Sequence, residues 1–212
     1  MIYMEKLNNY KNVKIIGVGG CGCRNVDLFR ETFKKSDYIL IDTNVMELDK
    51  NIKNIKCSMP FIRKCNGVII GLKAFLGGGV NNNPDLGEVA ALESQQEIEE
   101  SLQEAELVFI VAGLGGGTGT GASHIIAKCA KDKGATVIGV VTMPFAFEGG
   151  SKQIIAMEGL IKMDKTADGM VVFENEDLLK DELSASLSEV IKLKYTNYGD
   201  KFRDTLAKIY NR

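Results

Sequence analysis

Residues 113–121, Gly113-Leu-Gly-Gly-Gly-Thr-Gly-Thr-Gly121, decide the fold of this 212-residue chain. They follow an apolar segment, Leu107 to Ala112, and precede a helix that we expect to begin near Ala122. A strand that runs into a glycine loop and then a helix is the geometry of a phosphate cradle. Backbone N–H groups and the positive end of a helix favour negative charge. A flexible linker is the plain alternative, but linkers are not held between a buried strand and a helix.

This glycine loop lacks the lysine of a Walker A loop. That pattern ends in Gly-Lys-Ser/Thr, and its lysine reaches the outer phosphates. Here Ala122 and Ser123 follow Gly121, and the first lysine is Lys128. We therefore expect the site to hold phosphate with backbone dipoles, the hydroxyls of Thr118 and Thr120, and a metal ion.

A second glycine loop follows the first apolar segment, Val13 to Gly19. Its Gly17-x-Gly19-x-x-Gly22 pattern fits the dinucleotide fingerprint, and Asp42 ends the next strand about 20 residues later. Taken alone, this loop favours NAD. However, a dinucleotide enzyme does not need a second, richer phosphate loop, and no hydride-transfer apparatus follows. Two glycine loops at two strand ends suit one nucleoside triphosphate, and an NAD-dependent oxidoreductase remains the remote alternative.

Apolar strands and helical segments alternate along the chain. The expected strands are near-continuous apolar runs. Together with the alternation of strands and helices, they predict an α/β fold: a three-layer, Rossmann-like parallel sheet with helices on both faces. Between residues 51 and 76 we identify only short apolar segments. The expected strands cover 13–19, 38–42, 107–112, 136–142 and 169–174, and the expected helices cover 24–33, 85–105, 122–131, 150–163 and 187–210.

Composition limits the other possibilities. The chain is 45% hydrophobic and 25% charged, which suits one compact domain, and its net charge of −2 gives no basic footprint for direct nucleic-acid binding. It has no run long enough for membrane insertion and no signal-peptide core, so we expect a cytoplasmic protein. The five cysteines and the single histidine, His124, show no metal-ligand spacing. We expect reduced structural thiols and a histidine that packs rather than catalyses.

The sequence Gly115-Gly-Gly-Thr-Gly-Thr-Gly121 resembles the signature loop of the tubulin/FtsZ superfamily of GTP-dependent filament proteins. The stretches Asn83-Pro-Asp-Leu-Gly87 and Pro144-Phe-Ala-Phe-Glu-Gly149 are similar to FtsZ, and the likeness runs from about Val13 to Asn175. The resemblance implies the tubulin/FtsZ nucleotide-binding domain over residues 1–182. Residues 183–212 would form the central helix at which a second, smaller domain begins, and we expect that second domain to be absent.

The resemblance also implies a guanine-nucleotide site. In it, the first glycine loop wraps the α- and β-phosphates, Gly79 to Asn83 sense the γ-phosphate, and the signature loop holds the β- and γ-phosphates. Glu148 is the candidate ribose ligand, and Lys152 lies where the family uses arginine. Asn175 flanks the guanine, and Asn197, with Asp200 as the alternative, is the candidate for hydrogen-bonding it. The expected binding set is Gly19, Gly20, Cys21, Gly22, Asn25, Asp42, Asn44, Gly79, Gly115, Gly116, Gly117, Thr118, Gly119, Thr120, Gly121, Pro144, Glu148, Lys152, Asn175 and Asn197.

The chain departs from the family pattern at several of these positions. Asp42 and Asn44 stand where the family has Asn and Asp, so the two side-chain types are exchanged. Cys23 and Arg24 replace Gly or Asn beside the base and phosphates. Asn81 and Asn82 replace small residues in the γ-phosphate loop, where asparagine tolerates positive φ.

By this resemblance the protein is an FtsZ-like GTPase that forms filaments and serves cell division. A TubZ-like GTPase for phage or plasmid DNA segregation and a non-catalytic regulator of filaments are the alternatives. In the family, acidic residues on a loop after the central helix complete the site of the neighbouring subunit. The expected Asn-x-Asp-x-x-Asp pattern is missing here, so no catalytic residue is assigned. We expect binding of GTP, GDP and Mg²⁺, poor hydrolysis by this chain alone, and head-to-tail association with itself or a full-length homologue. Whether the chain is a fragment or a natural short variant stays open.

Overall fold

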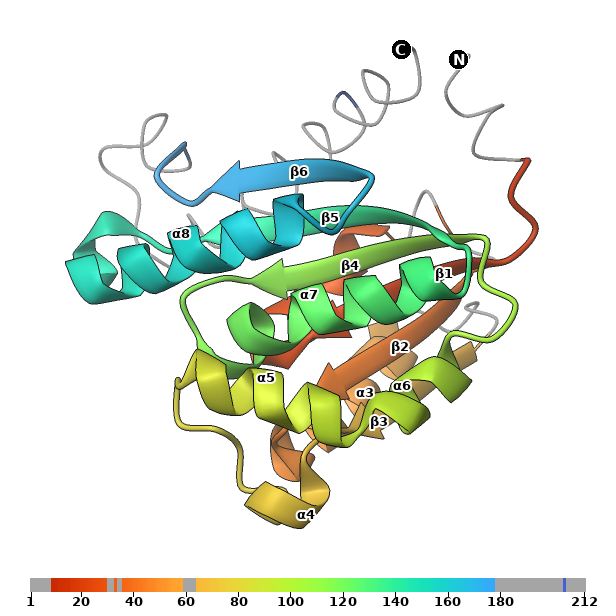
Figure 1. The fold of residues 1–212 in the computed structure, drawn as a ribbon, viewed down its shortest axis with the longest axis horizontal. Coiled ribbons are helices and arrows are strands. Elements are labelled where there is room, and N and C mark those ends of the chain that lie inside the picture. Colours follow the sequence, from red (N-terminus) through yellow and green to blue (C-terminus); the bar gives the residue numbers. More distant parts are fainter. Residues whose placement is uncertain (1–8, 30–32, 34–35, 59–63, 178–203, 205–212) are drawn as a thin grey trace.

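The computed structural model describes residues 9–29, 33, 36–58, 64–177 and 204. Its centre is a six-stranded, fully parallel sheet in the order β3-β2-β1-β4-β5-β6 (Figure 1). The strands are β1 (Val13–Val18), β2 (Asp37–Asp42), β3 (Lys64–Ile69), β4 (Leu107–Gly113), β5 (Thr136–Met143) and β6 (Gly169–Glu174). The predicted α/β fold class is therefore confirmed.

Helices cover both faces of the sheet. In Figure 1, α5, α7 and α8 lie across the near face, and α3 lies behind the sheet. None of the described helices is long and apolar enough to cross a membrane. The elements are α2 (Gly19–Asn25), the 3₁₀ turn η1 (Val26–Phe29), α3 (Val45–Ser58), α4 (Leu72–Phe75), α5 (Pro84–Glu93), α6 (Gln95–Ser101), α7 (Gly117–Asp132), the 3₁₀ turn η2 (Ala146–Glu148) and α8 (Gly150–Asp164).

Alternation along each strand builds two separate cores. In β4, Val108, Ile110 and Ala112 pack beneath α5, α6, α7 and α8. The intervening Phe109 and Val111 pack beneath α2, η1 and α3 on the other face. Because successive side chains of a strand point to opposite faces, a continuous apolar run fills both layers. The result is the three-layer arrangement.

The strand order places a topological switch point between β1 and β4. From β1 the chain moves outward through β2 and β3, and it then returns to β4 and moves the other way through β5 and β6. In open α/β sheets, ligands bind at the carboxyl ends of the strands where the order reverses. The two strands at this point, β1 and β4, are the ones that run into the two glycine loops.

Several element boundaries differ from the sequence-based expectation. The helix expected from Ala122 begins at Gly117, and the helix expected from Arg24 begins at Gly19, so both glycine loops supply the first turns of helices. The single helix expected over 85–105 is two helices, because Ser94 leaves helical geometry and its Oγ accepts a hydrogen bond from Gly71 N at 3.0 Å. The helix expected over 187–210, and the proposed domain boundary at 182, lie outside the described residues except for Asp204.

Candidate functional site

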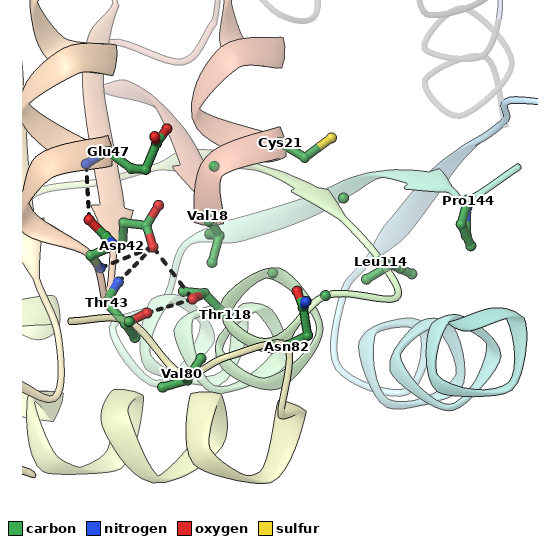
Figure 2. A pocket seen from close by; sticks show the side chains of 18 of the residues that line it. Val18, Cys21, Asp42, Thr43, Glu47, Val80, Asn82, Leu114, Thr118 and Pro144 are labelled. Atoms are coloured by element: carbon green, nitrogen blue, oxygen red, sulfur yellow. Dashed lines mark hydrogen bonds between the residues drawn. The ribbon is translucent and has the colours of Figure 1, made fainter. Parts of the chain in front are cut away.

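A pocket of about 480 Å³ opens at the carboxyl edge of the sheet, over the ends of β1 and β4. Figure 2 shows side chains from both glycine loops and from the ends of β2 and β5 around it. Its volume lies in the range of small-molecule sites. Most of the predicted binding residues that the structure describes line it, namely Gly19, Gly20, Cys21, Asp42, Asn44, Gly79, Gly116, Gly117, Thr118, Gly119, Pro144, Glu148, Lys152 and Asn175.

Other predicted residues lie outside the pocket lining and have packing roles. A methyl group on Gly22 would lie 2.1 Å from Val111 O, so this glycine lets α2 rest directly on β4. A methyl group on Gly121 would lie 2.0 Å from Pro84 O, where α5 crosses α7. These two glycines therefore set how the helices that surround the pocket pack. Asn197 and the alternative Asp200 lie outside the described residues.

Three further predicted residues are engaged with the protein itself. The backbone N–H of Gly115 donates to Thr120 Oγ1 at 2.8 Å, and Gly115 has φ +94°. The Asn25 side chain donates to Thr142 Oγ1 at 3.3 Å. These bonds fix the turn after β4 and the base of the pocket. Gly115, Thr120 and Asn25 therefore support the pocket without lining it.

The starts of α2 and α7 meet at the floor of the pocket. A methyl group on Gly19 would lie 2.9 Å from Gly119 N, and Gly19 has φ +69°. The N-cap residue of α7 is Gly116, which has no side chain to cap the first turn. The first N–H groups of a helix have no partner within the helix. The pocket is therefore lined by helix-start amides of α7, a 16-residue helix, and these suit an anion.

A hydrogen-bonded cluster ties the end of β2 to α7. Asp42 Oδ1 accepts from Thr43 N at 2.7 Å, from Asn44 N at 3.3 Å and from Thr118 Oγ1 at 3.4 Å. The hydroxyls of Thr43 and Thr118 lie 2.8 Å apart, as the dashed lines of Figure 2 show. Burial raises the pKa of Asp42 although these bonds oppose the shift. Sequence reasoning missed Thr43, whose partner lies 75 residues away.

The loop that precedes α5 forms one wall of the pocket. Gly79, Asn81 and Asn82 all have positive φ, so the two asparagines preserve the left-handed turns that small residues would make. Gly79 N donates to Thr43 O at 3.1 Å, and Asn83 Oδ1 caps α5 by accepting from Asp85 N at 2.9 Å. The loop is held at both ends, and its backbone faces the start of α7.

Side chains from the segment after β5 form the opposite wall. Glu148 Oε2 accepts from Lys152 Nζ, and Glu148 Oε1 accepts from Phe145 N at 2.8 Å. The two predicted sugar-side residues therefore form an ion pair with each other at the pocket edge.

The charges of the pocket lining come from five side chains: Arg24, Lys152, Asp42, Glu47 and Glu148. Among the described residues, no group of three or more His, Cys, Asp or Glu side chains could hold a metal ion alone. Mg²⁺ usually takes one or two carboxylates together with substrate phosphates and water. Asp42 and the Thr118 hydroxyl line the pocket 3.4 Å apart and could hold such an ion beside a nucleotide phosphate.

Comparisons with known proteins agree with this geometry. A family model described as "Tubulin/FtsZ family, GTPase domain" matches residues 12–181. The chain is 30% identical to an empty FtsZ dimer structure from M. jannaschii, with a TM-score of 0.78 over 99% of this chain and 58% of that one. A GDP-bound monomer of CetZ1 from Haloferax volcanii is 24% identical, with a TM-score of 0.70 over 95% and 58%.

A more distant match shows the same fold. TubZ from Clostridium botulinum phage c-st is 18% identical, with a TM-score of 0.66 over 89% of this chain and 59% of that one. The likenesses to CetZ1 and TubZ show the fold alone, since they are below 25% identity. The chain spans less than two thirds of the length of each of these structures.

Proposed function

The chain belongs to the tubulin/FtsZ family, and from this premise we propose that its pocket binds GTP and GDP as part of a filament-forming GTPase. One observation carries the proposal: the two strands at the switch point, β1 and β4, both end in glycine-started helices that meet around one pocket. Backbone amides then replace the lysine of other phosphate loops. CetZ1, which shares this fold, was solved with GDP bound, and a guanine nucleotide is therefore the ligand that we propose here.

Each wall of the pocket has a proposed role toward the nucleotide. The starts of α2 and α7 hold the phosphates, and the Gly79 loop lies beside the terminal one. The Glu148–Lys152 pair faces the sugar and Asn175 flanks the base. Asn197, with Asp200 as the alternative, is the proposed hydrogen-bond partner of the base. Asp42 and the Thr118 hydroxyl would hold Mg²⁺, which would neutralise part of the phosphate charge. NAD is disfavoured because α7 offers a second set of phosphate-binding amides that a dinucleotide fingerprint does not need.

The proposed biological role is cell division. The similarity to FtsZ reaches 30% identity, whereas the similarity to phage TubZ is 18%. The Pro144-Phe-Ala-Phe-Glu-Gly149 stretch also resembles FtsZ. DNA segregation and regulation of filaments without catalysis remain the second candidates, favoured by the departures at Arg24, Asn81 and Asn82.

We propose that hydrolysis depends on assembly. Of the carboxylates that line the pocket, Asp42 is engaged by Thr43, Asn44 and Thr118, and Glu148 is engaged by Lys152 and Phe145. Glu47 lies on α3, on the opposite side of the Asp42 cluster from α7 (Figure 2). A carboxylate that orients the attacking water would come from a neighbouring molecule, which supplies positioning and electrostatic stabilisation.

GTP turnover measured against protein concentration tests this proposal. A filament-forming GTPase whose subunits complete one another's sites gives a specific rate that rises steeply with concentration. This 212-residue chain alone gives a low rate that a full-length FtsZ homologue stimulates. GTP binding without turnover under either condition would favour the regulator, and NADH binding without GTP or GDP binding would overturn the nucleotide assignment.

A further inference from the structure

Arg24 is a cation of the pocket that the Asp42 and Glu148 clusters do not use. It lies on α2 one turn after Cys21, and both side chains line the pocket. The Lys152 ammonium is paired with Glu148. Arg24 makes no ion pair with any of the described residues, although Glu47 lines the same pocket. A solvent-exposed guanidinium is thus left at the pocket wall with its donors available.

The Arg24 guanidinium lies over the first turn of α2, near the floor of the pocket, where the phosphates are proposed to bind. A methyl group on Gly20 would lie only 3.3 Å from Arg24 Nη1, so the side chain reaches back along the helix toward Gly20. Helical side chains tilt toward the N-terminus of their helix, which explains this direction. Gly20 is the neighbour of Gly19, where the starts of α2 and α7 meet. Arg24 therefore points toward the phosphate end of the pocket.

The charges of the pocket lining bear on the role of Arg24. The lining holds three carboxylates, Asp42, Glu47 and Glu148, against the two cations Arg24 and Lys152. A polyphosphate would enter a pocket whose side chains carry no excess of positive charge. A guanidinium forms two parallel hydrogen bonds to phosphate oxygens and stays charged at any physiological pH.

We propose that Arg24 binds the phosphate chain of the nucleotide, as a side-chain cation added to the backbone cradle. This inference rests on the proposed function, because it needs a guanine nucleotide in the pocket. It assigns Arg24 to the phosphates rather than to the base. It also predicts that the contribution of Arg24 grows with the number of phosphates on the ligand.

Binding of guanosine, GMP, GDP and GTP by calorimetry tests the assignment in wild type and in Arg24→Gln. The variant is expected to bind GDP and GTP between about tenfold and a hundredfold more weakly, the range for a lost charge-assisted hydrogen bond. Guanosine affinity is expected to stay unchanged. Arg24→Lys is expected to be intermediate, because it keeps the charge but loses the planar fork. Lys50→Ala removes one exposed charge from α3 away from the pocket lining and is expected to bind like wild type.

Two results would overturn the inference while leaving the proposed function intact. One is wild-type GDP affinity in Arg24→Gln. The other is an equal loss for guanosine and GDP, which would place Arg24 on the base or sugar. A wild-type chain that binds none of the four ligands would instead overturn the proposed function, and this inference with it. Circular dichroism of each variant separates a binding loss from a folding loss.

Discussion

Asp42 is a charged side chain with 4% relative exposure, at the centre of the hydrogen bonds between β2 and α7. Its raised pKa means that the folded state holds the proton of this carboxyl more tightly than the unfolded chain does. The stabilisation that follows is fully present below the unfolded pKa, near 3.8, and is lost as pH rises through the folded pKa. At neutral pH the buried charge therefore opposes folding of the empty protein.

We predict that Asp42→Asn stabilises the empty protein at pH 7. The amide oxygen still accepts from Thr43 N and Thr118 Oγ1, but no charge is buried. The difference in free energy of unfolding between the variant and wild type should increase from pH 4 upward and then level off. Chemical denaturation at a series of pH values measures it, with the exposed Asp49→Asn as the matched control. A variant that is less stable than wild type at pH 7 would show that the hydrogen bonds of the charged Asp42 carboxylate outweigh the cost of burying its charge.

Glycines that pack and glycines that face the ligand cannot be told apart in the sequence. Gly22 and Gly121 belong to the two loops that we predicted as phosphate cradles, but they meet Val111 O and Pro84 O in neighbouring elements. The sequence identifies where the chain needs glycine. Which partner makes the glycine necessary depends on how α2 lies on β4 and how α5 lies on α7.

Gly22→Ala and Gly121→Ala are predicted to lower the free energy of unfolding by about 1–3 kcal/mol or more, because the added methyl meets a backbone oxygen. Gly150→Ala is the control, since nothing lies within 4 Å of its added methyl. It is expected to be neutral or to stabilise α8 by up to about 1 kcal/mol. Urea denaturation measures all three. Equal stability of the three variants would contradict the assigned packing roles.

At the scale of elements, α5 and α7 approach closely through glycine. Methyl groups on Gly87 and Gly121 would lie 2.4 Å from Gly117 O and 2.0 Å from Pro84 O. Glycine has low helix propensity, which is why the sequence predicted a loop where α7 begins. Tertiary packing overrides that preference. The strands could be predicted better, since β1, β2, β4 and β5 are apolar runs, whereas the edge strand β3 (KCNGVI) carries exposed polar residues and was not recognised.

Glu88 of α5 connects the helices on one face of the sheet. Its Oε2 lies 2.7 Å from Lys162 Nζ of α8 and 3.4 Å from His124 Nε2 of α7. The hydrogen bond from Lys162 is the main cause that lowers the pKa of Glu88. Burial lowers the pKa of His124, and the nearby Glu88 charge partly opposes that shift.

The pKa of His124 is predicted to lie below 6.5 and to fall further in Glu88→Gln, which removes the opposing charge. His124 is the only histidine of the chain, so an NMR titration of its ring protons in untagged protein gives the value directly. As pH falls, the unfolded chain binds this proton at a higher pH than the folded protein does. His124 therefore makes the folded state less stable as pH falls below about 6.5. His124→Gln should remove that part of the pH dependence. A pKa at or above 6.5 would contradict the burial of this ring.

At the scale of the whole molecule, three large exposed apolar side chains lie close in sequence to residues that line the pocket. Met46, Leu76 and Phe147 are 82%, 86% and 67% exposed. Each is next to, or within two residues of, a residue that lines the pocket. An exposed apolar surface around a ligand site is typical of an interaction surface. It supports the proposal that another molecule covers the nucleotide in a head-to-tail assembly.

The double variant Met46→Asp, Leu76→Asp is predicted to lose GTP-dependent self-association, or association with a full-length FtsZ homologue, and to keep GDP affinity within about threefold. Sedimentation velocity with GTP measures the assembly. Leu92→Asp, a change on α5 away from the pocket lining, is the control and should assemble like wild type. Unchanged assembly of the double variant would remove this surface from the interface.

The fold of the molecule could be predicted from the sequence more completely than its site. The apolar strands and the two glycine loops were enough to predict the parallel three-layer fold and the edge at which the pocket lies. The pairing of Thr43 with Thr118, the position of Arg24 over Gly20 and the mutual engagement of Glu148 and Lys152 depend on distances between elements that the sequence does not contain. The roles predicted for Asn197 and the final helix stay predictions.

The central claim is that the uncapped amides at the start of α7 hold the phosphates of a guanine nucleotide without a lysine. A titration of ¹⁵N-labelled protein with GDP, followed by amide chemical shifts, tests it most directly. We predict the largest shifts at Gly117, Thr118 and Gly119, together with Gly19 and Gly20, and none at Lys14 or Lys64 at the opposite edge of the sheet. Saturation with GDP while the amides of residues 117–119 stay unmoved would contradict the claim.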